Sequence, residues 1–231
     1  VSINEIIKDS YLNKYPDSAV YYSLLQYQLA EKTSNKKMMC NALLNQGISL
    51  KNTAKFQEAL KYLFKSLDLS HEINYEKNLA DSYKNIGSIY YRQGLYKMTL
   101  DNYLKSLNIY EKIRDTNGVA SCYNNIGLVY MYKGLFDKAL DYYLKCWDIL
   151  KLTENKKGIA FTNNNIGIIY FNLNNLNKAL EYYHLSLLAF EELDSKYHIT
   201  TLKNNIGDVY LSQNNFDDAL KYYKSSLDLA E

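Results

Sequence analysis

The sequence predicts an all-α protein built as a solenoid of antiparallel helix pairs, and two observations carry this prediction. Glycine recurs every 40 residues along the 231-residue chain, at Gly47, Gly87, Gly127, Gly167 and Gly207. Apolar residues recur three and four positions apart between turn signals, as they do in amphipathic helices. A fixed period of this length is typical of stacked-repeat proteins, whose extended surfaces hold other molecules. The functional question is therefore which face binds.

The segment 80–119 shows the two helices of one repeat. The first is predicted around Gly87, the second ends near Ile113, and Gly94 marks the turn between them. Residues 114–117 connect to the next unit. One repeat is thus predicted to be an antiparallel helix pair with short connections. The residues on the predicted apolar faces are Tyr83, Ile86, Tyr90, Thr99, Leu100, Tyr103, Leu107 and Tyr110.

The recurring glycine needs a structural reason, because glycine inside a helix costs roughly 1 kcal/mol relative to alanine. We expect the paired helix to approach closely at a point where a Cβ atom would block it. The second helix offers a small residue for that crossing at Ala59, Ala139, Ala179 and Ala219. The abundant tyrosines are predicted to be mainly packing residues whose hydroxyls reach the surface.

The period divides the chain into about six units, 1–39, 40–79, 80–119, 120–159, 160–199 and 200–231. The first is atypical, with Ile7 in place of the glycine and a second helix that starts near Pro16, and is predicted to be an N-terminal cap. No polar cap follows the last helix, which predicts an apolar edge at Tyr222, Tyr223, Leu227 and Leu229. We hypothesise that the chain is cut from a longer protein or that this edge packs on a partner, including end-to-end self-association.

The recurring motifs resemble the tetratricopeptide repeat. An aromatic residue precedes Ile-Gly, a tyrosine follows, and then come Gly-x-aromatic-x-x-Ala-Leu and Tyr-Tyr-x-x-Ser-Leu. The 40-residue period is similar to the long variant of kinesin light chain, the Pins/LGN scaffolds and Rap-type bacterial regulators. The resemblance implies a right-handed superhelix whose first helices line a concave groove.

The resemblance implies thirteen candidate ligand-binding residues in that groove. One position is asparagine in every glycine-containing unit, and other candidates precede it or lie one turn away. The thirteen candidates are Asn45, Asn85, Asn125, Asn165, Asn205, Lys84, Asn124, Asn164, Asn204, Leu128, Ile168, Phe161 and Asp208.

A row of asparagines suits an extended peptide, because each amide offers donors and an acceptor that match a peptide backbone. The alternatives are that these amides bond to neighbouring first helices and set the stacking, or that asparagine is simply common in this composition. Leu128, Ile168 and Phe161 add an apolar patch that suits one or two hydrophobic anchors of a ligand. Ordinary packing between repeats is the alternative for that patch.

Charge and composition exclude several classes of function. The net charge is +2 with both signs mixed along the chain, which disfavours a nucleic-acid track or a polybasic membrane patch. Cationic groove candidates are few, Lys84 and Arg92, so a strongly acidic C-terminal ligand is not expected. The three cysteines and three histidines lack metal-ligand spacing, and no phosphate-binding glycine loop is present. We expect no cofactor, no metal and no enzymatic activity.

Three functions fit these observations to different degrees. The first is a protein-interaction module, a scaffold or regulator, that binds a peptide or partner helix in its groove. The second is a sensory or regulatory segment of a bacterial signalling protein, linked to a histidine kinase or cyclase, or a quorum-peptide regulator. The third, an RNA-binding helical repeat, lacks the basic track that phosphates require. The sequence leaves the compartment open: it favours the cytoplasm slightly, and the periplasm would fit the sensor of a membrane kinase.

Overall fold

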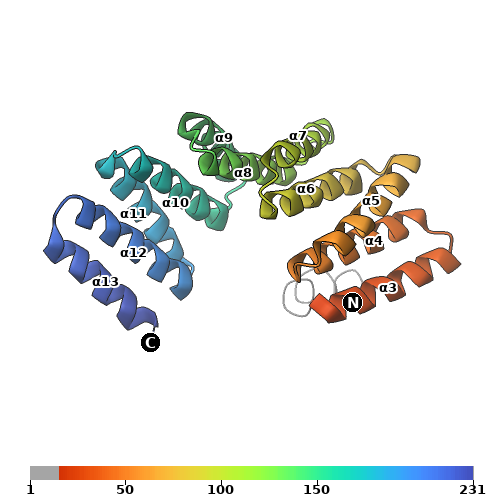
Figure 1. Cartoon of the computed structure of the whole chain (residues 1–231), viewed down its shortest axis with the longest axis horizontal. Coiled ribbons are helices and arrows are strands. Elements are labelled where there is room, and N and C mark those ends of the chain that lie inside the picture. Colours follow the sequence, from red (N-terminus) through yellow and green to blue (C-terminus); the bar gives the residue numbers. More distant parts are fainter. Residues whose placement is uncertain (1–15, 231) are drawn as a thin grey trace. The chain divides into compact units, whose positions relative to one another are not determined.

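The computed structural model describes residues 16–230, and these residues form helices joined by short connections, without strands (Figure 1). The first helices of the repeats are α4 (Lys36–Asn52), α6 (Glu76–Arg92), α8 (Thr116–Tyr132), α10 (Lys156–Asn172) and α12 (Lys196–Ser212). The second helices are α3 (Pro16–Lys32), α5 (Phe56–Glu72), α7 (Tyr96–Lys112), α9 (Phe136–Leu152), α11 (Leu176–Glu192) and α13 (Phe216–Ala230).

The chain forms two compact halves, Val1–Cys122 and Tyr123–Glu231, and the boundary falls within α8. In each half, helices that follow one another in sequence pack side by side. This packing confirms the predicted all-α helix-pair repeat. The single solenoid over 1–231 and its unit boundaries stay predictions, and the helices begin near 36, 76 and 156, a few residues before the predicted units.

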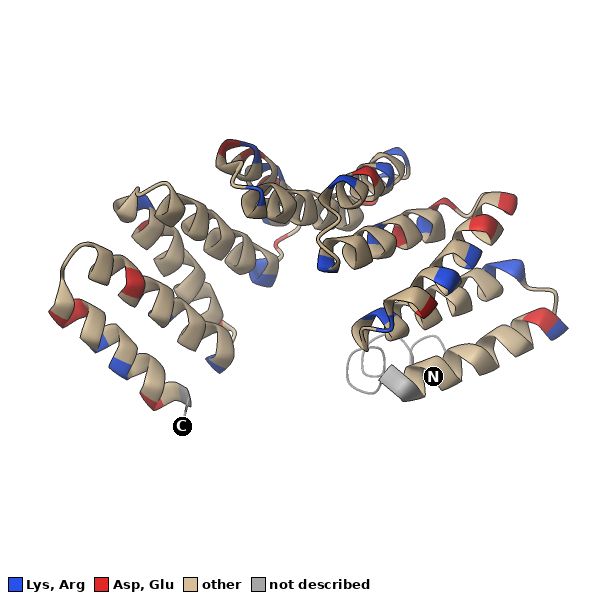
Figure 2. Ribbon diagram, in the orientation of Figure 1, with Lys and Arg blue, Asp and Glu red and all other residues tan. Residues whose placement is uncertain are grey.

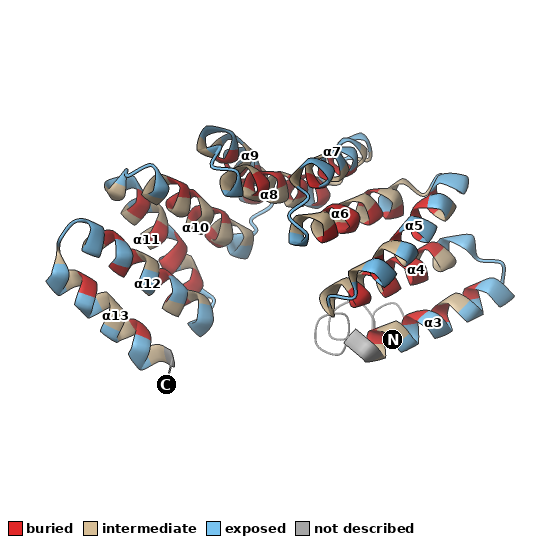
Figure 3. Ribbon diagram, in the orientation of Figure 1, coloured by how far each residue is buried: buried red, intermediate tan, exposed pale blue. Residues whose placement is uncertain are grey.

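The core of each half lies between its paired helices (Figure 3). Leu63, Ile86 and Ile89 are buried in the N-terminal half, and Tyr183 and Ile206 in the C-terminal half. Buried serines of second helices add a recurring bond, in which the hydroxyl donates to a carbonyl of the paired first helix. Ser106 Oγ donates to Ala80 O at 2.8 Å, and Ser186 Oγ donates to Ala160 O at 2.8 Å. These bonds satisfy hydroxyls that would otherwise be costly to bury.

Every connection between described helices has three residues and one backbone geometry. At the connection between α4 and α5, Ala54 N donates to Lys51 O at 3.1 Å and Lys55 N donates to Leu50 O at 2.9 Å. These two bonds end a helix through a residue in the left-handed region. The middle residues, all with positive φ, are Ser34, Ala54, Asn74, Gly94, Arg114, Gly134, Glu154, Asn174, Asp194 and Asn214.

The recurring glycines do meet the paired helix, but what approaches them differs from our expectation. A Cβ atom on Gly167 would lie 2.6 Å from the ring of Tyr183, and one on Gly87 would lie 2.8 Å from the ring of Tyr103. The small residues of the second helix were expected at this contact. Instead, the nearest atoms at Gly87, Gly127, Gly167 and Gly207 belong to a tyrosine ring, which explains why glycine and tyrosine recur together. At Gly47 they belong to Leu63 and to the backbone oxygen of Ala59.

The predictions for the two ends of the chain concern an N-terminal cap and an apolar edge on the last helix. The predicted replacement of glycine by Ile7 lies outside the described residues, while α3 begins at Pro16 as expected. On the last helix, α13, Leu227 is 61% exposed, and Phe216 and Leu220, which were not predicted, are 63% and 52% exposed. Tyr222, Tyr223 and Leu229 are only partly exposed. The apolar edge is therefore present but is built mainly from other residues.

Charged residues of both signs are scattered over the helices of both halves (Figure 2). The three cysteines, Cys40, Cys122 and Cys146, are buried thiols that form no disulfide among the described residues. None of the described helices has the length and apolar character needed to cross a bilayer.

Candidate functional site

The five asparagines at the repeated position, here called the asparagine column, all lie on first helices. Asn45, Asn125, Asn165 and Asn205 are partly exposed, whereas Asn85 is buried, with 7% of its surface exposed. The column is thus not uniform, and the two halves use it differently.

In the C-terminal half, side-chain amides join neighbouring first helices. Asn165 Nδ2 on α10 donates to Asn124 Oδ1 on α8 at 3.4 Å. Asn205 Nδ2 on α12 donates to Asn164 Oδ1 on α10 at 3.1 Å. Each of these two asparagines therefore bonds to a residue of the previous repeat, the one that stands just before the asparagine column there. These bonds support the stacking role that the sequence left open.

Stacking leaves part of each amide without a partner among residues 16–230. An asparagine side chain has two N–H donors and an oxygen that can accept twice. The oxygens of Asn165 and Asn205, and the amino groups of Asn124 and Asn164, make no further hydrogen bond with the described residues. One set of side chains can thus both hold the helices in register and present groups to a ligand.

The remaining candidates of this half lie on the same three helices. Leu128 and Ile168 are partly buried and lie one turn beyond the bonded asparagines on α8 and α10, while Asn204 and Asp208 are exposed on α12. Asp208 accepts a hydrogen bond from Tyr223 Oη at 2.6 Å.

Phe161 has a packing role in the structure. Its ring meets Phe190 edge-on at 5.0 Å between centroids and meets His198 edge-on at 4.9 Å. His198 in turn stacks on Phe190 at 4.4 Å. Phe161 therefore packs between α10, α11 and α12, in line with the packing alternative.

In the N-terminal half, the buried Asn85 forms hydrogen bonds through both its oxygen and its amino group. Lys51 Nζ, at the end of α4, donates to Asn85 Oδ1 at 2.7 Å, and Asn85 Nδ2 donates to Asp81 O at 2.8 Å. Arg92 donates to the backbone oxygen of Lys51 at 3.3 Å. Lys84 forms an ion pair with Asp81 at 3.3 Å.

Lys51, Lys84 and Arg92 together form a cationic cluster, the name we use for them below. Burial, and then the charges of Arg92 and Lys84, lower the pKa of Lys51 to about 8. Lys84 and Arg92 were predicted as cationic groove candidates from the sequence, whereas Lys51 was not. Lys51 stands 34 residues before Asn85, in the last turn of α4. The available signal was that a lysine occupies a position where the later repeats have uncharged residues, Tyr91, Met131, Phe171 and Leu211.

A family model described as "Tetratricopeptide repeat" matches residues 38–112, 78–151 and 158–231, which together exceed half of the chain. No curated protein sequence matches the chain. Among solved structures, BtubC (BKLC) from P. vanneervenii is similar with a TM-score of 0.82 at 15% identity, and the match covers 94% of this chain and 91% of that one.

Two further solved structures are similar in fold. A Signal Transduction ATPase with Numerous Domains that has a tetratricopeptide repeat sensor, from Pyrococcus horikoshii, gives a TM-score of 0.85 at 19% identity, with 99% of this chain and 35% of that one covered. A Rap protein complexed with Competence and Sporulation Factor gives 0.71 at 16% identity, with 99% and 62% covered. The family match, together with the helix pairs and their glycine–tyrosine contacts, leads to one conclusion: the chain belongs to the tetratricopeptide repeat family.

Proposed function

We propose that this chain is a protein-interaction module that binds an extended peptide segment along its first helices. The observation that carries the proposal is the pair of bonds Asn165–Asn124 and Asn205–Asn164. They hold amide groups at the same position on successive helices and leave further donors and acceptors free. Peptide backbones present N–H and C=O groups at regular spacing, so such a row binds main chain with little dependence on side chains.

The cationic cluster gives the N-terminal half a different preference. Lys51, Lys84 and Arg92 supply three positive charges, of which the described residues neutralise Lys84 through Asp81. A ligand carboxylate at this surface would relieve the mutual repulsion of the three cations, because it introduces the opposite charge at close range. The proposal is therefore that an acidic side chain or a C-terminus binds there. This revises the expectation that acidic ligands are disfavoured, which was based on two cations alone.

Two of the similar structures support a regulatory form of this function. One is described as complexed with Competence and Sporulation Factor and another as having a tetratricopeptide repeat sensor. A sensor segment of a signalling protein binds its signal through the same surface as a scaffold binds its partner. The two readings differ in whether binding changes the state of an attached domain.

The test uses substitutions that preserve stacking and remove only the groups offered to a ligand. Asn124→Asp and Asn164→Asp keep the Oδ1 acceptor for Asn165 and Asn205 but replace the free amino group. The exposed Asn177 on α11 provides a control, since Asn177→Asp changes the charge equally at a second helix. Thermal melting establishes that all proteins fold alike.

Random dodecapeptides displayed on phage are then selected on the native chain, and the selected peptides are measured by calorimetry. We expect binding to weaken about tenfold or more in the Asn124→Asp, Asn164→Asp double variant, since each lost hydrogen bond costs about 0.5–1.5 kcal/mol and about 1.4 kcal/mol is a factor of ten in affinity. Asn177→Asp should bind as the native chain does. Equal affinities for all three proteins would assign the asparagines to stacking alone.

A further inference from the structure

The second helices carry a tyrosine at one repeated position, with a single exception. In α9, α11 and α13 this tyrosine stacks on a tyrosine of the preceding first helix. Tyr142 stacks on Tyr130 with centroids 5.6 Å apart, Tyr182 on Tyr170 at 5.5 Å, and Tyr222 on Tyr210 at 5.5 Å. The residues at this position along the chain are Tyr22, Tyr62, Asn102, Tyr142, Tyr182 and Tyr222.

Asn102 on α7 leaves a tyrosine pair without the third ring that contacts the equivalent pair in the next repeat. In the next repeat, Tyr142 stacks on Tyr130 and also meets Tyr123 at 5.9 Å. The residues equivalent to Tyr123 and Tyr130 are Tyr83 and Tyr90, and both are present on α6. The shorter Asn102 side chain turns back to its own helix, where Nδ2 donates to Met98 O at 2.8 Å. The place of the third ring is therefore open.

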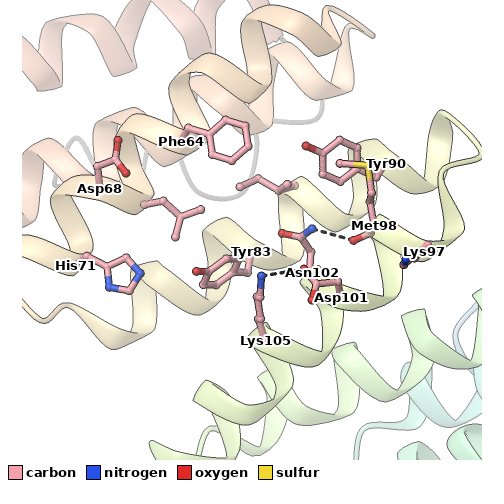
Figure 4. Close-up of a pocket in the computed structure, with 12 residues that line it drawn as sticks. Phe64, Asp68, His71, Tyr83, Tyr90, Lys97, Met98, Asp101, Asn102 and Lys105 are labelled. Carbon is pink, nitrogen blue, oxygen red and sulfur yellow. Dashed lines mark hydrogen bonds and ion pairs between the residues drawn. The ribbon is translucent and has the colours of Figure 1, made fainter.

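A groove of about 730 Å³ lies at this place, between α5 and α7 with α6 as its floor (Figure 4). Tyr83 and Tyr90 line it together with Asn102, and Phe64 and Met98 stand at its sides, 46% and 44% exposed. The groove is larger than one aromatic ring and falls within the range of about 300–1,000 Å³ that ligand pockets show. It has room for a ring and for neighbouring residues of a peptide.

The charges around the groove complement an aromatic ring with a basic neighbour. Lys105 forms an ion pair with Asp101 at 2.8 Å and lies 5.7 Å above the ring of Tyr83. In the next repeat, Lys145 pairs with Asp141 in the same way but lies over Tyr142, the ring that is missing here. An incoming ring would thus meet an ammonium group already in place, an attraction of the cation–π type. Asp68, on the rim, has no ion pair with any described residue.

We propose that the α5–α7 groove binds a tyrosine or phenylalanine side chain of a partner polypeptide, between Tyr83 and Tyr90, with a Lys or Arg neighbour at Asp68. The three intact tyrosine stacks show the geometry that the bound ring adopts. On α6, Tyr83, Ile86 and Tyr90 lie on one side and Asn85 on the other, because residues two apart on a helix point about 160° apart. The groove is therefore a second surface, independent of the asparagine column.

The first measurement tests whether the groove is a vacant ring position. In Asn102→Tyr, the protein supplies its own ring where the other repeats have one. We expect the melting temperature to rise by several degrees, since a well-placed aromatic pair stabilises a fold. Asn102→Ala, which keeps the place open, should not raise it. A lower melting temperature for Asn102→Tyr would show that no ring fits and would overturn the proposal.

The second measurement tests binding. Pools of heptapeptides with fixed lysine at the third position and tyrosine, phenylalanine or alanine at the centre are titrated with the chain. We expect the native chain and Asn102→Ala to bind the tyrosine and phenylalanine pools at least tenfold more tightly than the alanine pool. Asn102→Tyr should lose this preference. Absence of the preference in the native chain, or its persistence in Asn102→Tyr, would overturn the proposal.

Sedimentation at several concentrations identifies the remaining occupant, a second copy of the chain. Self-association that Asn102→Tyr abolishes would give the groove to that copy and overturn the proposed partner. A monomeric native chain that binds the aromatic pools supports it. The asparagine variants Asn124→Asp and Asn164→Asp should leave this binding unchanged, so failure of one proposal does not imply failure of the other.

Discussion

At the scale of single residues, the repeats act as internal controls for one another. A residue that departs from its repeated position can be compared with its equivalents in the same chain. Gln46 is 2% exposed at a position that is otherwise isoleucine, and its Oε1 has no hydrogen-bond partner among the described residues. The equivalents Ile86, Ile126, Ile166 and Ile206 are all buried. Gln46 is thus a polar group in an apolar place.

Replacing Gln46 with isoleucine should stabilise the N-terminal half. A buried polar atom without a partner costs about 1–3 kcal/mol, so Gln46→Ile should raise the free energy of unfolding by a similar amount. Urea unfolding followed by circular dichroism measures it. Gln57→Ile, at an exposed position of α5, controls for the change in residue type and should alter stability by no more than about 0.5 kcal/mol. A loss of stability in Gln46→Ile would mean that the amide has a partner in solution.

Lys51 predicts a pH dependence. Its pKa is lowered to about 8 in the folded chain, from an ordinary value of 10.5, mainly by burial. Between these pH values the unfolded chain binds the proton and the folded chain has released it, so the contribution of Lys51 to stability rises with pH. Below pH 8 Lys51 is protonated in both the folded and the unfolded chain, and the full cost of burying its charge lowers the stability of the folded chain.

The measurement compares the native chain with Lys51→Met at several pH values. The variant should be the more stable protein at pH 7, and the difference should shrink as the pH approaches 10.5. Lys65→Met, at an exposed position of α5, controls for the change in residue type. A difference that stays constant over this range would contradict the burial of a charged Lys51. Removing Lys51 should also weaken binding of an acidic peptide near neutral pH, if the cationic cluster binds it.

At the scale of helices, the glycine–tyrosine contact decides how tightly a pair packs. The space between the glycine and the facing tyrosine ring differs between repeats. An added Cβ would lie 2.6 Å from Tyr183 at Gly167, but 3.1 Å from Tyr143 at Gly127. Real Cβ atoms do not approach to 2.6 Å, so at Gly167 the buried ring has to move.

Gly167→Ala should therefore destabilise the chain more than Gly127→Ala does. Overpacking costs about 1–3 kcal/mol and the higher helix propensity of alanine returns up to about 1 kcal/mol, so we expect a net loss of about 1–2 kcal/mol at Gly167. Gly127→Ala should be close to neutral. Chemical denaturation of both variants measures the order. The reverse order would show that the rings adjust in a way the distances do not indicate.

At the scale of the whole chain, helices differ in how far their neighbours cover them. Leu187 on α11 is 7% exposed, while its equivalent on α13, Leu227, is 61% exposed. Elements with few buried contacts open most often. Amide hydrogens of α13 should exchange with solvent at least tenfold faster than those of α11, as hydrogen exchange with mass spectrometry would report. Equal protection would mean that α13 is covered in solution, for example by a second copy of the chain.

The sequence predicted the helix pairs because period and amphipathic spacing depend on the backbone and on burial alone. It also placed the asparagine column on the first helices, while the column's role as a binding site stays a prediction. It could not reveal the contact between Lys51 and Asn85, 34 positions apart, or the α5–α7 groove, whose lining residues lie on three helices, since both form only after the helices pack. The positive φ at residues such as Ala54 and Arg114 was equally hidden, because neither is glycine, and the predicted connection 114–117 is in fact 113–115, since α8 begins at Thr116. There the geometry is imposed by the helices on either side.

The uniform three-residue connections have a consequence for how such a gene can change. Unequal recombination between repeats adds or removes a multiple of 40 residues. Because every described helix end meets the next helix start through the same backbone conformation, such an event joins compatible ends wherever it occurs. A lineage can therefore vary the number of repeats without designing a new junction. Exceptions such as Asn102 can then be copied, lost or moved to another repeat as a unit.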